Sequence, residues 1–395
     1  MLTQARTIID ELVATRRDIH MHPELGFQEH RTAALVADRL RALGLRVETG
    51  IGITGVVGHL GKGDPIVALR ADMDALPVTE ENDVPYASRN PGVMHACGHD
   101  AHTAMLLGAA RLLADLWANP ATRPAGSVRF LFQPSEEKSD DEGKSGARRM
   151  VEDGAMDGVE AIFGQHVYSG LKAGRIETMA GYSAAASDGF YATLTGQGSH
   201  GAYPHKGNDP LFMLVPVLSA IHGIVSRHID PLEPAVITVG TIHGGTAPNV
   251  IPQTVELSGT IRSYDSLVRQ TLFHELETAL GVVRALGGDY SLFIKEGYPA
   301  CYNDPGLVDL IRQAGHDLLG DGNSEPRTRR GMGAEDFGIL AQEAKGAMFA
   351  LGTLPDDGVE RRGHSPTFDI NEKALPVGTA MLAEAARRYL VENER

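Results

Sequence analysis

Cysteine, aromatic residues and positive charge are all scarce in this chain of 395 residues. Its two cysteines, Cys97 and Cys301, cannot form the disulfide framework of a small secreted protein. A formal net charge of −15 provides no basic face for a phosphate backbone, so the sequence predicts no nucleic-acid partner. We identify neither an apolar run of about 18 residues nor a signal-peptide core, which predicts a cytoplasmic protein without membrane contact.

The chain is longer than one hydrophobic core usually serves, which favours two domains. Apolar residues at helical spacing predict two helices within residues 1–43. Short apolar strands then alternate with amphipathic helices, which is typical of an α/β fold with a mostly parallel sheet and helices on both faces. We expect strands at 66–70, 128–132, 161–166 and 347–351, and helices at 103–117, 147–153, 307–319, 334–344 and from 372 onward.

The middle of the chain has a different order of elements. Residues 189–294 read strand, helix, strand, strand, helix, strand, which is the β-α-β-β-α-β order of a ferredoxin-like α+β unit. The expected strands lie at 190–194, 235–242, 254–263 and 291–294, and the expected helices at 211–229 and 267–286. We therefore predict that residues 183–297 form a domain inserted into a larger one, which comprises residues 1–182 and 298–395.

The densest cluster of reactive side chains is the run His95-Ala96-Cys97-Gly98-His99-Asp100-Ala101-His102, just before a predicted helix. A thiolate and an imidazole two residues apart cannot share a helical face, but they can converge from a loop. This pair suits zinc or a similar transition metal. Two alternatives stay open: a helix-capping segment with scattered histidines, and Cys97 as a nucleophile with His99 as its base.

An acidic pair, Glu136-Glu137, follows a predicted strand at its carboxyl end. Taken alone, it would be a solvated surface pair. However, Asp72 and Asp74 follow a second strand and His166 ends a third. Because sites of open α/β sheets form outside the carboxyl ends of their strands, we expect these side chains to lie together.

These donors outnumber what one tetrahedral ion needs, which favours two metal ions bridged by a solvent oxygen. Such a pair acidifies bound water and polarises a carbonyl group. A carboxylate left free beside the metals could then take the proton from that water. One glutamate of the pair would bind metal while its neighbour acts as this base.

Other candidates stand alone in loops or beside strand ends. His364 precedes the last helix and would ordinarily be a surface histidine. The glycine-rich loop 331–338 leads into a helix, and its backbone donors could hold an anionic substrate group. In the inserted domain, His200, Asn249 and Arg262 lie beside strand ends, where a structural role is an equal alternative.

Together these motifs resemble the M20 family of metallopeptidases and aminoacylases, over nearly the whole chain. The branch it resembles is that of the N-acyl-amino-acid amidohydrolases, which includes hippurate hydrolases, auxin-conjugate hydrolases and N-acetyldiaminopimelate deacetylases. The matching motifs lie at 17–24, 70–77, 97–100, 136–137, 199–205, 249–252, 333–337 and 363–364.

The resemblance implies a catalytic domain of the zinc-peptidase type that holds two divalent metal ions, Zn, Mn, Co or Ni. It implies that Cys97 bridges the metals and that the other ligands are His99, Glu137, His166 and His364. Glu136 would be the general base that activates water and later protonates the leaving amine. Asp74 would orient one of the metal ligands.

For the inserted domain, the resemblance implies a lid that also forms a homodimer or a higher oligomer. His200 would stabilise the tetrahedral oxyanion, often from the partner subunit, while Asn249 and Arg262 would hold the substrate carboxylate. The implied reaction is hydrolysis of small N-acyl amino acids. A dipeptidase or carboxypeptidase with the same centre is the main alternative, and a metal-binding protein without catalysis is a weaker one. A charged insertion at 138–144 departs from the family pattern.

Overall fold

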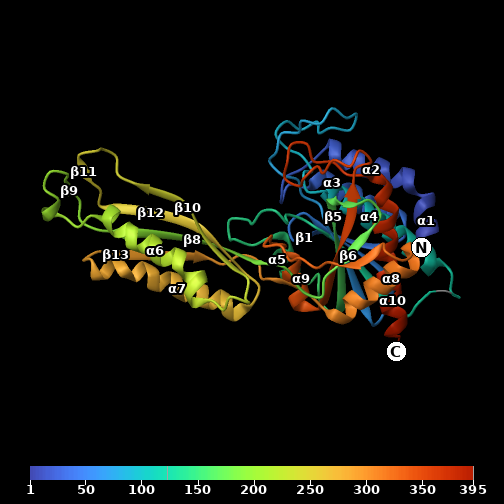
Figure 1. Ribbon diagram of the computed structural model, residues 1–395. Helices are drawn as coiled ribbons and strands as arrows, with labels where there is room; N and C mark the ends of the chain where they lie inside the picture. Colours follow the sequence, from blue (N-terminus) through green and yellow to red (C-terminus); the bar gives the residue numbers. More distant parts are fainter. Residues whose placement is uncertain (122, 395) are drawn as a thin grey trace. The chain divides into compact units, whose positions relative to one another are not determined.

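The computed structural model describes residues 1–121 and 123–394. The chain divides into two compact units (Figure 1). The large unit comprises Met1–Gly181, Tyr302–Arg329 and Asp336–Arg395, and the small unit comprises Tyr182–Cys301 and Arg330–Glu335. The catalytic and lid roles expected for two domains stay predictions.

The large unit contains an eight-stranded mixed sheet. Its strands, in spatial order, are β1 (Arg46–Ile51), β2 (Gly55–Lys62), β4 (Gly126–Gln133), β3 (Ile66–Asp72), β5 (Val159–Lys172), β16 (Lys345–Leu354), β6 (Ile176–Thr178) and β15 (Ser324–Pro326). The central strands β4, β3, β5 and β16 are parallel, as predicted. The edges differ from the prediction, because β2 pairs antiparallel with both β1 and β4, and β6 pairs antiparallel with β16.

Helices cover both faces of this sheet. Adjacent residues of β5 show this: the Phe163 ring contacts Tyr389 in one helix, while a Cβ at Gly164 would meet Phe337 in another. Since neighbouring residues of a strand face opposite sides, these helices lie on opposite faces. The helices of the large unit are α1 (Leu2–Thr7), α2 (Ile9–Met21), α3 (His30–Ala42), α4 (His99–Ala118), α5 (Gly146–Glu152), α8 (Pro305–Leu319), α9 (Phe337–Glu343), the 3₁₀ turn η2 (Glu372–Ala374) and α10 (Leu375–Glu392). The α/β class is confirmed.

Two details of the large unit correct the sequence-based expectations. The N-terminal segment contains three helices instead of two, because Ile8 leaves the helical region (φ −109°, ψ 15°) and separates α1 from α2. His166 does not end a strand, since β5 continues to Lys172.

The small unit has the predicted β-α-β-β-α-β order. Its antiparallel sheet has the spatial order β10 (Ala235–Gly244), β12 (Thr254–Ser263), β8 (Ala186–Thr195) and β13 (Asp289–Lys295). Helices α6 (Pro210–His228) and α7 (Ser266–Ala285) pack on each other and on this sheet (Figure 1). The small unit also contains β9 (Ser199–His200) paired with β11 (Val250–Ile251), and the 3₁₀ turn η1 (Pro204–Lys206). Strands β7 (Gly181–Ala184) and β14 (Cys301–Asn303), which pair with each other, include residues of both units.

Helix α6 corrects the expectation that the chain lacks a long apolar run. Its length and composition would suffice to cross a membrane, with a mean hydropathy of 1.5. However, Met213, Val217 and Ile221 are buried in the hydrophobic core of the small unit. The core helix of a folded domain has the same composition, so this one helix is weak evidence for a membrane span.

Candidate metal centre

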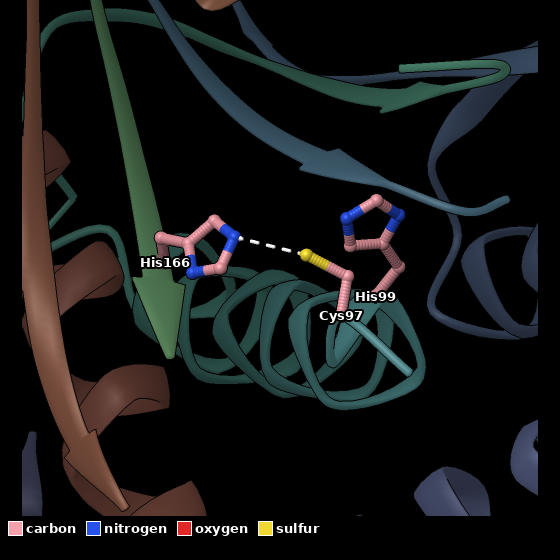
Figure 2. Close-up of side chains that lie close together, drawn as sticks. All are labelled: Cys97, His99 and His166. Atoms are coloured by element: carbon pink, nitrogen blue, oxygen red, sulfur yellow. Dashed lines mark hydrogen bonds between the residues drawn. The ribbon is translucent and has the colours of Figure 1, made fainter. Parts of the chain in front are cut away.

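The loop before α4 brings Cys97 and His99 to one place. Gly98 between them has a left-handed backbone (φ 90°), which glycine adopts without strain. It also lies against β5, because a Cβ at this position would be 2.3 Å from Val167 Cγ2. The Cys97 Sγ atom then lies 3.4 Å from Nε2 of His166, with the His99 side chain beside it (Figure 2).

Hydrogen bonds fix the orientation of both imidazoles. Nδ1 of His99 donates to the backbone oxygen of Asp74 over 2.9 Å and lies 3.1 Å from its carboxylate. Nδ1 of His166 donates to the backbone oxygen of Val167 over 2.8 Å. In each ring the other nitrogen, Nε2, faces an acidic group, Cys97 Sγ for His166 and the Asp72 carboxylate, 3.7 Å away, for His99, and is the atom that would bind a metal.

Glu137 and His364 complete the cluster. Nε2 of His364 lies 3.1 Å from Oε1 of Glu137, and this contact raises the pKa of His364. The backbone N–H of His364 donates to the oxygen of Ala96, directly before Cys97. Asp74 reaches this side as well, because its Oδ2 accepts the backbone N–H of Glu137 over 3.0 Å. One buried carboxylate therefore contacts both His99 and Glu137.

Among the described residues, five groups of His, Cys, Asp and Glu have donor atoms within 4.8 Å of one another, and three of these groups together contain the predicted ligands. The three groups are Cys97 with His99 and His166, Cys97 with Glu137 and His364, and His99 with Glu136 and Glu137. All five predicted ligands and the predicted base are thus brought together. Cys97, His99 and Glu137 each belong to two of these three groups.

The pKa values of the predicted ligands are shifted in different directions. Burial raises the pKa of the Cys97 thiol to about 12 and lowers the pKa of His166 to about 3, which keeps that imidazole neutral and able to bind metal. Against the effect of burial, the Asp72 carboxylate and Cys97 raise the pKa of His99. A nucleophile and a metal ligand both require the thiolate, so it is the position of Cys97 among other ligand-type side chains, and not its pKa, that favours ligation.

Glu136 is buried, and hydrogen bonds hold both its carboxylate and the residue before it. Its Oε1 accepts the backbone N–H of Asp336 over 3.4 Å. Asp336 is itself fixed, since its carboxylate accepts hydrogen bonds from Arg70 and Gln133, each over 2.9 Å. Glu29 accepts the backbone N–H of Ser135, the residue before Glu136, over 2.8 Å. One backbone donor of loop 331–338, the Asp336 N–H, is thus directed at Glu136, and the expectation that this loop holds an anionic substrate group stays a prediction.

Some buried polar groups beside the centre were not identified from the sequence. His102 donates from Nδ1 to Asp72 over 2.6 Å and accepts at Nε2 from Val167 N–H, so both of its nitrogens are used within the fold. Asp100 binds Arg16 over 2.7 Å and His20 over 2.8 Å. The sequence showed His102 and Asp100 only as members of the polar run at 95–102, in which metal ligands and structural residues look alike.

The small unit places its three predicted residues at two different ends. His200 and Asn249 lie close together and exposed, because His200 pairs with Val250 in the β9–β11 ladder. Arg262 lies near the far end of β12, where its Nη1 donates to the backbone oxygen of Ile261. At about 3.3 Å per residue, β12 separates the two places by roughly 25 Å. Asn249 and Arg262 therefore do not lie side by side in one small unit, and their role in holding the substrate carboxylate stays a prediction.

Comparison with known proteins agrees with this centre. Residues 68–388 match Peptidase family M20/M25/M40. Thermostable carboxypeptidase 1 of Saccharolobus solfataricus is 40% identical over 97% of this chain and 96% of its own length. N-acetyl-L-cysteine deacetylase of Bacillus subtilis is 37% identical over 98% and 90%. The crystal structure of the Bacillus subtilis YXEP protein, a dinuclear metal binding peptidase from the M20 family, is 31% identical, covers 98% of this chain and 99% of that one, and has a TM-score of 0.83.

Proposed function

The chain belongs to Peptidase family M20/M25/M40, and from this premise we propose that it hydrolyses the amide bond of N-acyl amino acids. The products would be a carboxylic acid and a free amino acid. The observation that carries the proposal is the convergence of five ligand-type side chains around a sixth, Glu136, that can act as a base. The N-acetyl-L-cysteine deacetylase relative supports an acyl amino acid as the substrate.

The donor set fits two divalent metal ions. Thiolate, imidazole and carboxylate together suit Zn, Mn, Co or Ni. Cys97 would be the shared ligand of the two ions, because its thiolate lies in one group with His99 and His166 and in another with Glu137 and His364, which would be the other ligands. When bound, such a pair supplies Lewis acidity toward the amide carbonyl and the attacking water.

The residues of the chain then handle the protons. Glu136 takes a proton from the attacking water at its carboxylate, and later gives it to the nitrogen of the leaving amine. The Asp336 N–H holds Glu136 in place for both transfers. Asp74 keeps His99 and Glu137 in a fixed relation, so that the ligands need little rearrangement.

His200 and Asn249 are proposed to act from a second subunit. Their separation from Arg262 along β12 supports this, because one small unit cannot bring all three to one substrate. His200 would stabilise the oxyanion and Arg262 would bind the substrate carboxylate, with Asn249 on the partner's side. Arg262 has no carboxylate partner within ion-pair distance in the described part of the chain.

The small unit also offers a surface for a homodimer. Phe212 and Val215 of α6 are 65% and 64% exposed, and β10 is an open edge of the sheet. An exposed apolar helix beside an open edge is suited to pair with a second copy across a two-fold axis. Phe212→Asp should yield monomers by light scattering and should reduce hydrolysis. A fully active monomer would refute action in trans.

The main alternative is a carboxypeptidase or dipeptidase with the same centre. The carboxypeptidase relative supports it, since it is the more similar of the two curated relatives named above. A panel of N-acetyl and N-benzoyl amino acids against dipeptides decides between them. Brisk dipeptide cleavage with little turnover of any acyl amino acid would replace the proposed substrate. We propose a cytoplasmic location and a small-molecule substrate.

Glu136→Gln tests the mechanism. The carboxamide has nearly the same shape but cannot accept a proton, so turnover should fall by roughly 100-fold or more while metal content stays unchanged. Glu137→Gln is the matched control, because it should reduce metal content as well. Normal turnover by a metal-loaded Glu136→Gln protein would show that another group is the base.

A further inference from the structure

Arg327 holds a positive charge beside the candidate metal centre, within the large unit. It follows strand β15, and its backbone N–H donates to the oxygen of Thr178 over 2.6 Å. Its guanidinium carbon lies 4.7 Å from the ring centre of Tyr168, in the geometry of a cation–π contact. The position of this charge is therefore fixed at both its backbone and its head group.

Tyr168 connects Arg327 to the centre. It lies two residues after His166 on β5, so both side chains share one face of the strand. The two rings are in contact, with centroids 5.2 Å apart. Tyr168 is 37% exposed, which leaves part of its ring open to a ligand. The guanidinium is thus two consecutive contacts away from a predicted metal ligand.

The charge of Arg327 is not neutralised by the fold. No carboxylate in the described part of the chain lies within ion-pair distance of its guanidinium. Two carboxylates, Glu177 and Glu325, lie on the same face of the sheet as His166. Glu325 is paired with Glu177 across neighbouring strands, Glu177 with Ala350, and Ala350 with His166. Neither forms an ion pair with Arg327. A stacked guanidinium without a counter-ion retains its fork of donors for a carboxylate of a ligand.

We propose that Arg327, positioned on Tyr168, binds a second carboxylate of the substrate and makes the enzyme selective for N-acyl amino acids that carry one. This inference rests on the proposed function and narrows its substrate class. The second carboxylate has two possible sources: the side chain of an acidic amino acid, or the far end of a dicarboxylic acyl group.

Two isosteric substrate pairs distinguish these sources. The first is N-acetyl-L-glutamate against N-acetyl-L-glutamine, and the second is N-succinyl-L-alanine against its terminal amide. The wild-type enzyme should prefer the charged member of one pair by roughly 10- to 100-fold in kcat/KM, which is the range of a hydrogen-bonded charge pair. Arg327→Ala should remove that preference by slowing only the charged substrate.

Matched variants separate recognition from general electrostatics. Arg329→Ala removes an exposed charge of the same sign two residues away and should leave the preference unchanged. Arg327→Lys retains the positive charge but lacks the planar fork of donors, so it should show only part of the wild-type preference for the charged substrate. Glu177→Gln should not weaken the preference. Equal rates on both members of each pair, or an equal loss on charged and neutral substrates in Arg327→Ala, would overturn the inference.

A binding measurement separates this inference from the proposed hydrolysis. Calorimetry with metal-loaded Glu136→Gln protein compares the charged and neutral ligands without turnover. The inference is supported if the Glu136→Gln protein binds a charged ligand more tightly than its neutral partner and if the double variant with Arg327→Ala loses this difference. This holds even if no acyl amino acid is hydrolysed. Equal binding of charged and neutral ligands overturns it even if hydrolysis is confirmed.

Discussion

Replacing Asp74 with asparagine tests whether this buried carboxylate organises the metal ligands. Its two oxygens contact two donors, since Oδ1 lies 3.1 Å from Nδ1 of His99 and Oδ2 accepts the N–H of Glu137 over 3.0 Å. A carboxamide has only one acceptor oxygen, so its NH₂ group must face one of these donors. An unsatisfied buried donor costs about 1–3 kcal/mol.

The effect on metal affinity depends on the hydrogen bonds that the variant retains. Loss of an orienting partner usually weakens metal binding by roughly 10–100-fold. His99 retains its 2.9 Å hydrogen bond to the backbone oxygen of Asp74, which asparagine does not remove. We therefore expect a loss near the lower limit, roughly tenfold, or about 1.4 kcal/mol.

The assay is metal titration of the apoprotein in competition with a chelator, followed by hydrolysis at limiting and at saturating metal. Asp74→Asn should lose activity at limiting metal and regain much of it at saturation. Asp188→Asn is a matched control, because Asp188 is an equally buried carboxylate bonded to Arg269 in the small unit. It should change stability without changing metal affinity. Unchanged metal affinity in Asp74→Asn would refute the reasoning.

Three further predictions concern the surroundings of the centre. Burial raises the pKa of Glu29 from 4.5 to about 7, so the folded state favours the protonated carboxyl group. The stability that this group contributes is therefore complete below pH 4.5 and is lost as the pH rises through about 7. Glu29→Gln should therefore gain up to about 3 kcal/mol in unfolding free energy relative to wild type between pH 4.5 and about pH 8, measured by urea unfolding. Gly98→Ala should cost about 1–3 kcal/mol and abolish metal binding, and Val167→Ala should restore only part of this, since the strained φ remains. Arg16→Met should cost about 3–5 kcal/mol, because it removes the guanidinium and leaves His20 as the remaining ion-pair partner of the buried Asp100 carboxylate; a loss below about 1 kcal/mol by chemical unfolding would contradict this.

The small unit was predictable because its periodicity alternates cleanly between strand and helix. Helix α6 shows this, since its predicted span of 211–229 differs by one residue at each end from Pro210–His228. The β1–β2 hairpin was missed because glycines interrupt residues 50–63 and remove the apolar alternation. Strands β6 and β15 have three residues each, too few for any pattern to appear.

The candidate site was predictable as a set of residue types, and less so as an arrangement. Parallel central strands bring Asp74 and Glu137 to the same edge of the sheet, as their positions after β3 and β4 indicated. The contacts of Glu29 and Asp336 around Glu136 depend on tertiary packing between distant segments, for which the sequence holds no local signal. The separation of Asn249 from Arg262 did have a signal, because the predicted strand of ten residues begins after Asn249 and has Arg262 near its far end.

The central claim is that the chain binds two metal ions that its hydrolytic activity requires. The most direct measurement is the metal content of the purified protein by mass spectrometry, combined with hydrolysis of an N-acyl amino acid before and after chelation. The account predicts two divalent ions per chain. Removal of the ions should abolish activity, and Zn, Mn, Co or Ni salts should restore it. Full activity in a metal-free chain that a thiol alkylator inactivates would contradict it.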